Sequence, residues 1–535
     1  MTEPAKKSEL SRHFLLRLFG CTLISVGLLQ GIYWHWSKAL CFDATFSVFA
    51  AQNAVEHGHF ETLEPNGQLG PDLGKIQLQW LNSWPPLVSL VYAALLKCGL
   101  TAGGATNCFT AVLLLGGTWL WVCCFKEAGA SRKALYCLAA LIPWTAFPIS
   151  AMSTFWNDFV PWALAPAAYL LLCRLPSSPT PSSRDLWLTW PVTGLVCGLL
   201  VVAKFSALPL VLGSGVYFLF RDGWRLTAPK IGYAIWFGFF LPLPGAIVYL
   251  LNRLWTGEAT AQVHGSQPLF PVGLPQVWNL IVSPLADLSG LSDIAFHLPA
   301  RLWITAGLSL PALVIWFGLG YAWFKRPRSE TPNHFVRLMI LMTVTTWGFL
   351  LFLTLILGYQ CDWTTQPRYS FPVAFAWLCG GMVLIFSQRV PKVLRICLAL
   401  AYCFPVSATL MAGAAKPFLH ASPVPLPQSH LAGTPGEREA YQFLEDRLAS
   451  DAQRRPQLIV ANQPHPMNEL LIPAVPWMYF ETQEKLTSSR PMVVWALLDP
   501  SSAEKLRQRL DEHGKVERVN TPAGFPWEFL IVSFP

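Results

Sequence analysis

Residues 16–36 read LRLFGCTLISVGLLQGIYWHW, and the chain continues over 37–45 as SKALCFDAT. The first stretch is long and apolar enough to cross a membrane, because about 20 residues of helix span the hydrocarbon core. No small-residue cleavage site follows it, and it is preceded by Lys6, Lys7, Arg12 and Arg17. We therefore predict an uncleaved first transmembrane helix with a cytoplasmic N-terminus. Asp43 then stands where the chain returns to water.

The composition agrees with a membrane protein. Hydrophobic residues make up 53% of the chain, charged residues only 13%, and the mean hydropathy is +0.41. A soluble fold could not keep so much apolar surface from water, so we expect a polytopic membrane protein with a polar remainder. The net charge of +8 does not indicate nucleic-acid binding, because the basic residues are spread over short loops.

Further apolar windows predict eleven membrane-spanning helices in total, near residues 16–36, 107–125, 134–151, 159–173, 187–203, 206–220, 231–251, 303–324, 335–357, 370–387 and 393–412. A twelfth stretch, 86–100, is short and contains Lys97 and Gly99. If this stretch does not cross, the inner loops hold 19 Lys and Arg residues and the outer loops hold 7. The positive-inside rule therefore favours eleven spans, with 86–100 at the outer interface.

The remaining segments define the domain organisation. Residues 1–415 form the predicted transmembrane domain, with large outer loops over 37–106 and 252–302. A Pro-rich linker over 416–430 leads to a soluble tail over 431–535. In the tail, helices are expected at 437–450 and 502–513 and strands at 457–461, 492–498 and 529–534. The fold class is thus mainly α, a polytopic membrane protein with a small C-terminal α/β domain on the periplasmic side.

Two carboxylates are the first candidates for chemistry. Asp43 follows the first span, and Asp158 occupies the matching place in FWNDF, residues 155–159. Charge next to hydrocarbon is costly, so an ionisable residue there is a functional candidate. Each carboxylate also has a plainer explanation as the cap of the helix that follows it. Lys204 ends one later span and Arg368 precedes another, at positions where basic side chains often only flank the membrane.

Several motifs in order resemble the GT-C glycosyltransferases, especially bacterial protein O-mannosyltransferases and aminoarabinose transferases. They are an Asp opening the first outer loop (Asp43), an Ala-rich segment ending in Gly (Phe49 to Gly58), a Pro-Pro-Leu element (Pro85 to Leu87), a second Asp before an apolar helix (Asp158), a Gly-containing span ending in Lys (Gly194 to Lys204), and Arg-Tyr before Pro (Arg368, Tyr369, Pro372). The resemblance covers about 37–390.

This resemblance implies an enzyme that moves a sugar from a polyprenyl-phosphate lipid to a lipid, protein or glycan acceptor at the periplasmic face of the bacterial inner membrane. Asp43 would serve as the catalytic base and Asp158 as a second catalytic residue that orients the acceptor or supports the site. The donor phosphate would be bound by Lys204, Arg368, Tyr369 and Lys75. Ala44 stands where many relatives have Glu, so the sequence supports no metal site and no cofactor.

Three alternatives stay open at the level of sequence. A lipid or glycolipid transporter, or a non-catalytic scaffold of envelope assembly, would also be polytopic, although transporters usually carry ionisable residues at mid-membrane. Glu56, His57, His59 and Glu61 lie close together, but without the fixed spacing of a metal motif they indicate a solvated loop. Cys41 and Cys361 are the two cysteines expected near the outer face, where a disulfide would be allowed.

Overall fold

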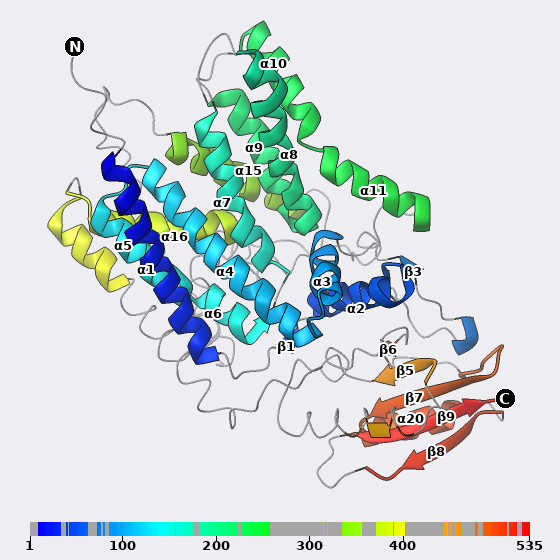
Figure 1. The fold of residues 1–535 in the computed structure, drawn as a ribbon. Coiled ribbons are helices and arrows are strands. Elements are labelled where there is room, and N and C mark those ends of the chain that lie inside the picture. Colours follow the sequence, from blue (N-terminus) through cyan, green and yellow to red (C-terminus); the bar gives the residue numbers. More distant parts are fainter. Residues whose placement is uncertain are drawn as a thin grey trace, which may run out of the picture.

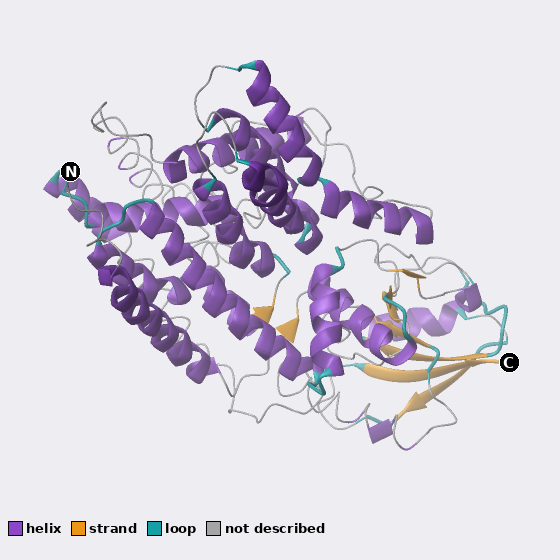
Figure 2. Ribbon diagram, turned by 45° about the horizontal axis from the view of Figure 1, so that its top comes forward, coloured by secondary structure: helices purple, strands orange, loops and turns teal. Residues whose placement is uncertain are grey.

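The computed structural model describes residues 9–33, 39–40, 42–62, 72–75, 79–80, 85–155, 157–175, 182–221, 226–256, 314, 318, 321, 334–355, 371–388, 390–401, 443, 446–447, 450, 456–461, 477–479, 485–510, 513–521 and 527–535. These residues form a helical part and a C-terminal part built on a β-sheet (Figures 1 and 2). The mainly helical architecture predicted from the sequence is confirmed for them.

The helical part contains α1 (Glu9–Tyr33), α2 (Phe42–His57), α3 (Leu87–Lys97), α4 (Ala102–Glu127), α5 (Arg132–Leu141), α6 (Ala146–Ser153), α7 (Phe159–Arg174), α8 (Trp190–Ala203), α9 (Leu208–Phe220), α10 (Ala228–Phe240), α11 (Leu243–Thr256), α15 (His334–Leu355) and α16 (Phe371–Ile385). Single turns lie at η2 (Leu73–Lys75), η3 (Ile142–Trp144), η4 (Asp185–Thr189) and η5 (Phe205–Ala207). Two short pairs of strands join the loops: β1 (Ala39–Leu40) with β4 (Thr154–Phe155), and β2 (Glu61–Thr62) with β3 (Gln79–Trp80).

The centre of the helical part is a close contact between α4 and α7. A Cβ atom on Gly117 would lie 2.7 Å from the Trp162 ring, so only glycine lets the two helices approach this far. The indole of Trp121 donates a hydrogen bond of 3.1 Å to the Trp162 carbonyl. Small residues at a contact between apolar helices are typical of membrane proteins, where packing replaces the hydrophobic effect.

A second close contact joins α8 to the bent pair α10–α11. The pair bends by 42° at residues 241–242. A Cβ atom on Gly198 would overlap the carbonyl oxygen of Leu241, so α8 passes directly against the bend. This contact places the start of α11 beside the C-terminal end of α8.

Many basic residues of the helices gather at one end of the bundle. Arg174 at the end of α7 donates to Glu127 at the end of α4, with Nε 3.0 Å from Oε1. Phe125, near the same end of α4, meets Phe335 at the start of α15, with ring centroids 5.2 Å apart. Arg337 in turn donates to the carbonyl of Arg221 at the end of α9. Basic residues that the sequence assigns to the inner loops therefore lie together at one end of the helices.

The number of membrane spans is supported only in part. Three helices of the described part are long and apolar enough to cross a bilayer, at Arg12–Ile32, Ala102–Glu127 and Asp185–Ala203, and the bent pair α10–α11 adds a broken fourth. Shorter apolar helices lie at Leu87–Lys97, Phe159–Arg174, Phe205–Phe220 and Pro372–Ile385. Most of the windows predicted at 303–324 and 393–412 lies outside the described residues. Eleven spans remains a prediction.

In the stretch 86–100, which the sequence predicts not to cross the membrane, the helix is α3 alone. Eleven residues of helix are roughly 16 Å long, whereas the hydrocarbon core is about 30 Å thick. The α3 helix packs on α2 and against the start of α4. There the Tyr92 hydroxyl donates a hydrogen bond of 3.1 Å to the Thr106 hydroxyl. This favours the sequence-based prediction that 86–100 does not cross.

The C-terminal part is a five-stranded sheet in the order β6 (Trp477–Tyr479), β5 (Leu458–Ala461), β7 (Met492–Leu498), β9 (Glu528–Phe534) and β8 (Lys515–Val519). The first three strands are parallel, and β9 and β8 are antiparallel to their neighbours. Strands β5, β7 and β9 coincide with the three predicted strands. The predicted helix at 502–513 is shifted to α20 (Pro500–Arg509), because Asp499 caps it. The predicted helix at 437–450 lies mostly outside the described residues.

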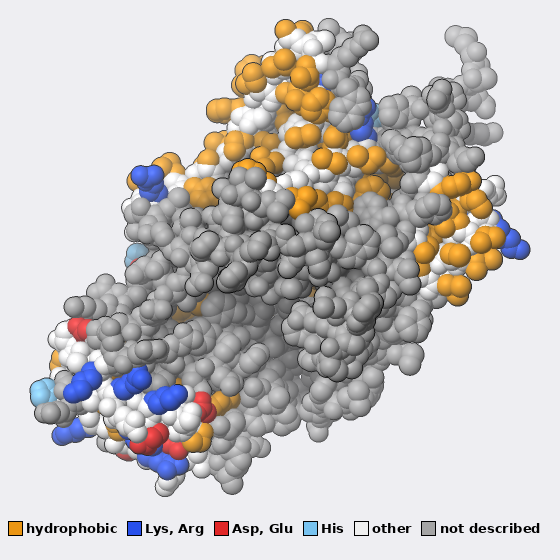
Figure 3. Space-filling model, turned by 180° about the vertical axis from the view of Figure 1, so that it is seen from behind, with side chains coloured by type: hydrophobic (Ala, Val, Ile, Leu, Met, Phe, Trp, Pro, Cys, Tyr) orange, Lys and Arg blue, Asp and Glu red, His pale blue; other side chains and the backbone are white. Residues whose placement is uncertain are grey.

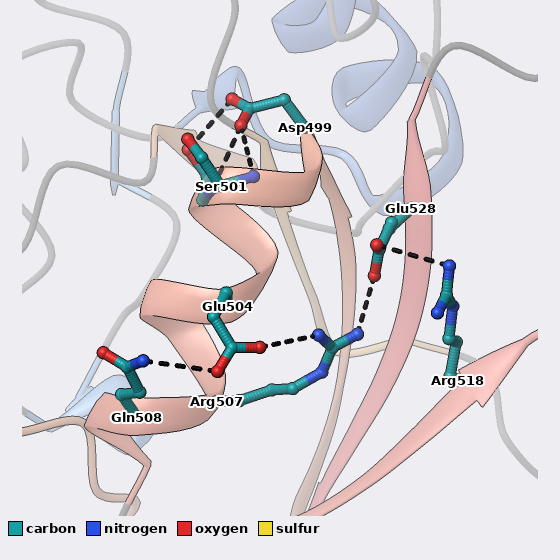
Figure 4. A network of polar contacts seen from close by, with 8 residues as sticks. Asp499, Ser501, Glu504, Arg507, Gln508, Arg518 and Glu528 are labelled. Carbon is teal, nitrogen blue, oxygen red and sulfur yellow. Dashed lines mark hydrogen bonds and ion pairs between the residues drawn. The ribbon is translucent and has the colours of Figure 1, made fainter.

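Charged side chains hold α20 to the sheet (Figure 4). Arg507 of α20 donates to Glu528 of β9 at 2.6 Å, and Arg518 of β8 lies 3.3 Å from the same carboxylate. Hydrogen bonds from Ser502 and Ser501 keep the pKa of Asp499 below its usual value. In Figure 3 the charged groups gather on this part, whereas apolar side chains cover much of the described surface of the helices. That contrast is expected for one part in water and one in lipid.

The orientation of the fold can be tested by labelling engineered cysteines in cells, with the native exposed cysteines replaced by serine. Lys133→Cys, at the basic end of the bundle, should react only after the membrane is permeabilised. Lys97→Cys, at the end of α3, and Lys505→Cys, on α20, should react with an impermeant reagent added from the periplasm. Each position is exposed, so permeabilisation serves as the control for reactivity. Periplasmic labelling of Lys133→Cys would overturn the predicted topology.

Candidate functional site

The pairing of β1 with β4 places the chain segments that carry the two candidate aspartates side by side. The two strands run parallel, with Ala39 opposite Thr154 and Leu40 opposite Phe155. Asp43 comes three residues after Leu40, and Asp158 comes three residues after Phe155. Both chains leave the pair in the same direction and enter helices α2 and α7. The two aspartates therefore occupy equivalent positions on adjacent segments, although they are far apart in sequence.

A buried hydrogen bond fixes α2 against the segment that carries Asp158. Asn157 donates from Nδ2 to the Ser47 hydroxyl at 3.1 Å, and both residues are buried. Ser47 stands four residues after Asp43 on α2, so the two positions share one face of the helix. The face of α2 that bears Asp43 is thus turned toward residues 157–158. The Asp43 side chain itself lies outside the described part.

Asp158 forms an ion pair with Lys204. The Lys204 Nζ atom lies 3.4 Å from Oδ2 of Asp158, and only 5% and 3% of the two side chains are exposed. Neither carboxylate oxygen of Asp158 accepts a hydrogen bond from a described residue. Acceptor positions on a buried carboxylate are normally filled, which makes this group available for a hydroxyl or amide brought by a substrate.

The plainer explanation of Asp158 as a helix cap does not match the geometry. Asp158 stands at the N-cap position of α7, but its backbone is helical, with φ −64° and ψ −17°, and its side chain makes no capping hydrogen bond. An aspartate that caps a helix has extended backbone and accepts from an amide two or three residues later. The carboxylate is instead directed to Lys204.

Lys204 owes its inward position to a break in the helix. After α8 ends at Ala203, the Lys204 backbone is extended, with φ −159° and ψ 130°, and the turn η5 follows. Its side chain does not extend along the surface to the membrane boundary, because the residue is only 4% exposed. Next to it, the Phe205 ring stacks on Tyr249 of α11, with centroids 5.2 Å apart. The ammonium group is therefore held at the end of α8 beside aromatic side chains.

The buried pair has clear electrostatic consequences. Burying one charge without a partner costs several kcal/mol, whereas a close pair of opposite charges recovers much of that cost. An incoming phosphate would offer Lys204 a second anionic partner, and Asp158 already holds the Lys204 side chain in place. The arrangement is suited to binding an anion next to a carboxylate.

The other predicted site residues are placed less completely. The backbone of Lys75 is in η2, which lies against residues 486–489 of the C-terminal part, while its side chain lies outside the described part. Arg368, Tyr369, Cys41 and Cys361 also lie outside it. Within the described ranges, no three His, Cys, Asp or Glu side chains meet as a metal site would require. Glu56 and His57 lie 4.0 Å apart and are half exposed.

Sequence reasoning found Asp158 and Lys204 separately but missed that they form a pair. It also missed Asn157 and Ser47, whose hydrogen bond joins α2 to the segment that precedes α7. The only signal in the sequence is that Asn157 precedes Asp158, because a serine in an apolar helix gives no indication of its partner.

The coupling between Asp158 and Lys204 can be measured with a double-mutant cycle on thermal unfolding in detergent. Asp158→Asn and Lys204→Met should each destabilise the protein by about 3–5 kcal/mol, because each leaves a buried charge without its partner. The double variant should recover most of this loss, since no charge then remains buried. If the two single effects simply add, the ion pair does not hold α7 to α8.

Similar proteins are found by structure. The sequence matches no family model and no curated relative. The fold is similar to the crystal structure of ArnT from Cupriavidus metallidurans bound to undecaprenyl phosphate, with 12% identity over 98% of both chains and a TM-score of 0.48. For the apo state of the same protein the identity is 13%, over 96% of this chain and 98% of that one, with a TM-score of 0.46.

A third similar structure is the arabinofuranosyltransferase AftD from Mycobacteria. The sequence identity is 12%, the alignment covers 96% of this chain and 41% of that one, and the TM-score is 0.43. ArnT and AftD are both glycosyltransferases of the GT-C type, the family that the sequence motifs resemble. TM-scores below 0.5 mark a loose likeness in the path of the chain. The roles of individual residues therefore rest on the motifs and on the geometry described above.

Proposed function

We propose that this protein is an integral membrane glycosyltransferase that moves a sugar from a polyprenyl-phosphate-linked donor to a lipid, protein or glycan acceptor at the periplasmic face. The observation that carries the proposal is the buried Asp158–Lys204 pair, set beside the segment that bears Asp43. The proposed transfer needs a carboxylate for the attacking acceptor group and a cation for the leaving phosphate, close to one another. The proposed site is assigned no cofactor and no metal.

The acceptor side of the reaction is assigned to Asp43. An acceptor hydroxyl or amide attacks the anomeric carbon of the donor, and its proton leaves as the new glycosidic bond forms. A positioned carboxylate that takes this proton, or stabilises the developing charge, typically speeds such a step by about 100-fold or more. Asp158, whose carboxylate oxygens accept no hydrogen bond from a described residue, supports the same acceptor group by hydrogen bonding.

The donor side is assigned to Lys204. When the bond between the sugar and the lipid phosphate breaks, the phosphate leaves with additional negative charge. A cation at the leaving oxygen stabilises that charge without supplying a proton. Asp158 holds Lys204 in place before the donor arrives. Arg368, Tyr369 and Lys75 are further proposed contacts to the phosphate, and Arg368 would bind two of its oxygens at once.

The position of the pair favours surface chemistry over transport. Asp158 precedes α7 and Lys204 follows α8, so the pair lies at the ends of these helices and not at their centres. Transporters place their coupling residues near the middle of the bilayer. The basic ends of α4 and α7 lie away from it, at the other end of the bundle.

The proposal is tested by Asp43→Asn in purified protein supplied with a polyprenyl-phosphate-linked sugar. The substitution keeps size and most hydrogen bonding but removes charge and basicity. Turnover should fall about 100-fold or more, while yield and melting temperature stay close to the wild type. Glu56→Gln is the matched control, because it makes the same chemical change at an exposed position on the same helix and should leave turnover intact.

Because α2 begins at Phe42, Asp43 stands inside the first turn of the helix and not at its cap position. Normal sugar transfer by the Asp43→Asn protein would therefore remove Asp43 from the reaction.

A further inference from the structure

A short piece of the first outer loop is inserted into the C-terminal part. Asp72 forms a parallel bridge with Thr487, and the Leu73 amide donates to the Thr487 carbonyl at 2.9 Å. Leu73 is 1% exposed and belongs to the apolar core of the sheet domain, with Leu458, Leu486, Val494 and Leu530. One loop residue thus fills a place in the core of a domain more than 380 residues further along the chain.

Asp72 and Gly74 shape the same contact. The Oδ1 atom of Asp72 accepts from the Gly74 amide at 3.0 Å and from the Ser489 amide at 2.8 Å. A Cβ atom on Gly74 would lie 2.7 Å from the Ser489 hydroxyl and 2.9 Å from the Ser489 backbone nitrogen. Because a backbone atom cannot turn aside, only glycine fits here. The segment 72–75 is therefore matched to residues 486–489 in hydrogen bonding and in shape.

The strands on either side of this segment are fastened to the helical part. Glu61 of β2 pairs with Trp80 of β3, and Thr62 pairs with Gln79. The buried Asn53 of α2 donates from Nδ2 to the Glu61 carbonyl at 2.7 Å. In addition, β3 lies against α11. One end of the loop is thus bound to α2, the helix that carries Asp43, and the segment 72–75 is bound to the C-terminal domain.

We propose that residues 72–75 are a docking segment that holds the C-terminal domain on the α2 end of the helical bundle. Leu73 is its anchoring side chain, and residues 486–489 with the sheet core are its binding surface. The domain is then attached at two points, through this segment and through the linker 416–430. This inference does not depend on sugar transfer, because it concerns only how the C-terminal domain is held against the helical part.

Hydrogen exchange in the full-length protein in detergent tests the docking segment. Leu73→Ser removes the apolar anchor, and Gly74→Val makes the close approach impossible without adding a polar group. Both variants should speed amide exchange about tenfold or more in residues 485–490, while exchange in β7 and β9 stays slow. Leu73→Met, which keeps an apolar side chain of similar volume, should leave exchange unchanged.

Two results would overturn the proposal. Unchanged exchange at 485–490 in Gly74→Val would mean that the segment does not dock there. Equally fast exchange throughout β7 and β9 in both variants would mean that residues 72–75 are an integral part of the folded sheet domain and not a separate docking element. Neither readout involves a sugar donor, so failure here is distinguishable from failure of the proposed enzymatic activity.

Discussion

A lysine ammonium buried beside an aspartate carboxylate is the constraint on which the candidate site depends. Either charge alone would be strongly destabilising at a site so shielded from water, so Asp158 and Lys204 must stay in contact. This contact holds the beginning of α7 to the end of α8. The helix break at Lys204 accompanies this pair, with extended backbone at Lys204 between α8 and η5. The pair places two opposite charges, both buried, at one end of a mainly apolar bundle.

Hydrogen bonds connect the segment around α2 to the segment that carries this ion pair. The β1–β4 pairing and the Ser47–Asn157 contact place the segment bearing Asp43 against the segment bearing Asp158. From there α2 continues to Asn53, which holds β2. The docking segment beyond β2 ends in the core of the C-terminal domain. These contacts lead from the buried ion pair to β2 on one side of the loop and from residues 72–75 to the C-terminal part on the other; Figure 1 shows α2 between the long helices and the sheet.

Much of this fold is predictable from sequence where a local pattern decides it. The long apolar stretches at 107–125 and 187–203 became α4 and α8, and the short, continuously apolar run at 492–498 became β7. Other features depend on partners that no local pattern reveals. The helical backbone of Asp158, the inward turn of Lys204 and the burial of Leu73 are set by residues distant in sequence. Sequence reasoning placed Asp158 and Lys204 on one face, but their contact needed the packing of α7 on α8.

We propose that the buried Asp158–Lys204 pair forms an anion site for a polyprenyl phosphate. The most direct measurement compares binding of polyprenyl phosphate to the wild type and to the double variant Asp158→Asn, Lys204→Met, each reconstituted in lipid nanodiscs. The double variant carries no unpaired buried charge, so lost binding would not be caused by unfolding. The account predicts that affinity falls about tenfold or more, as expected when a charge-assisted contact is removed. Equal affinity of the two folded proteins would contradict it.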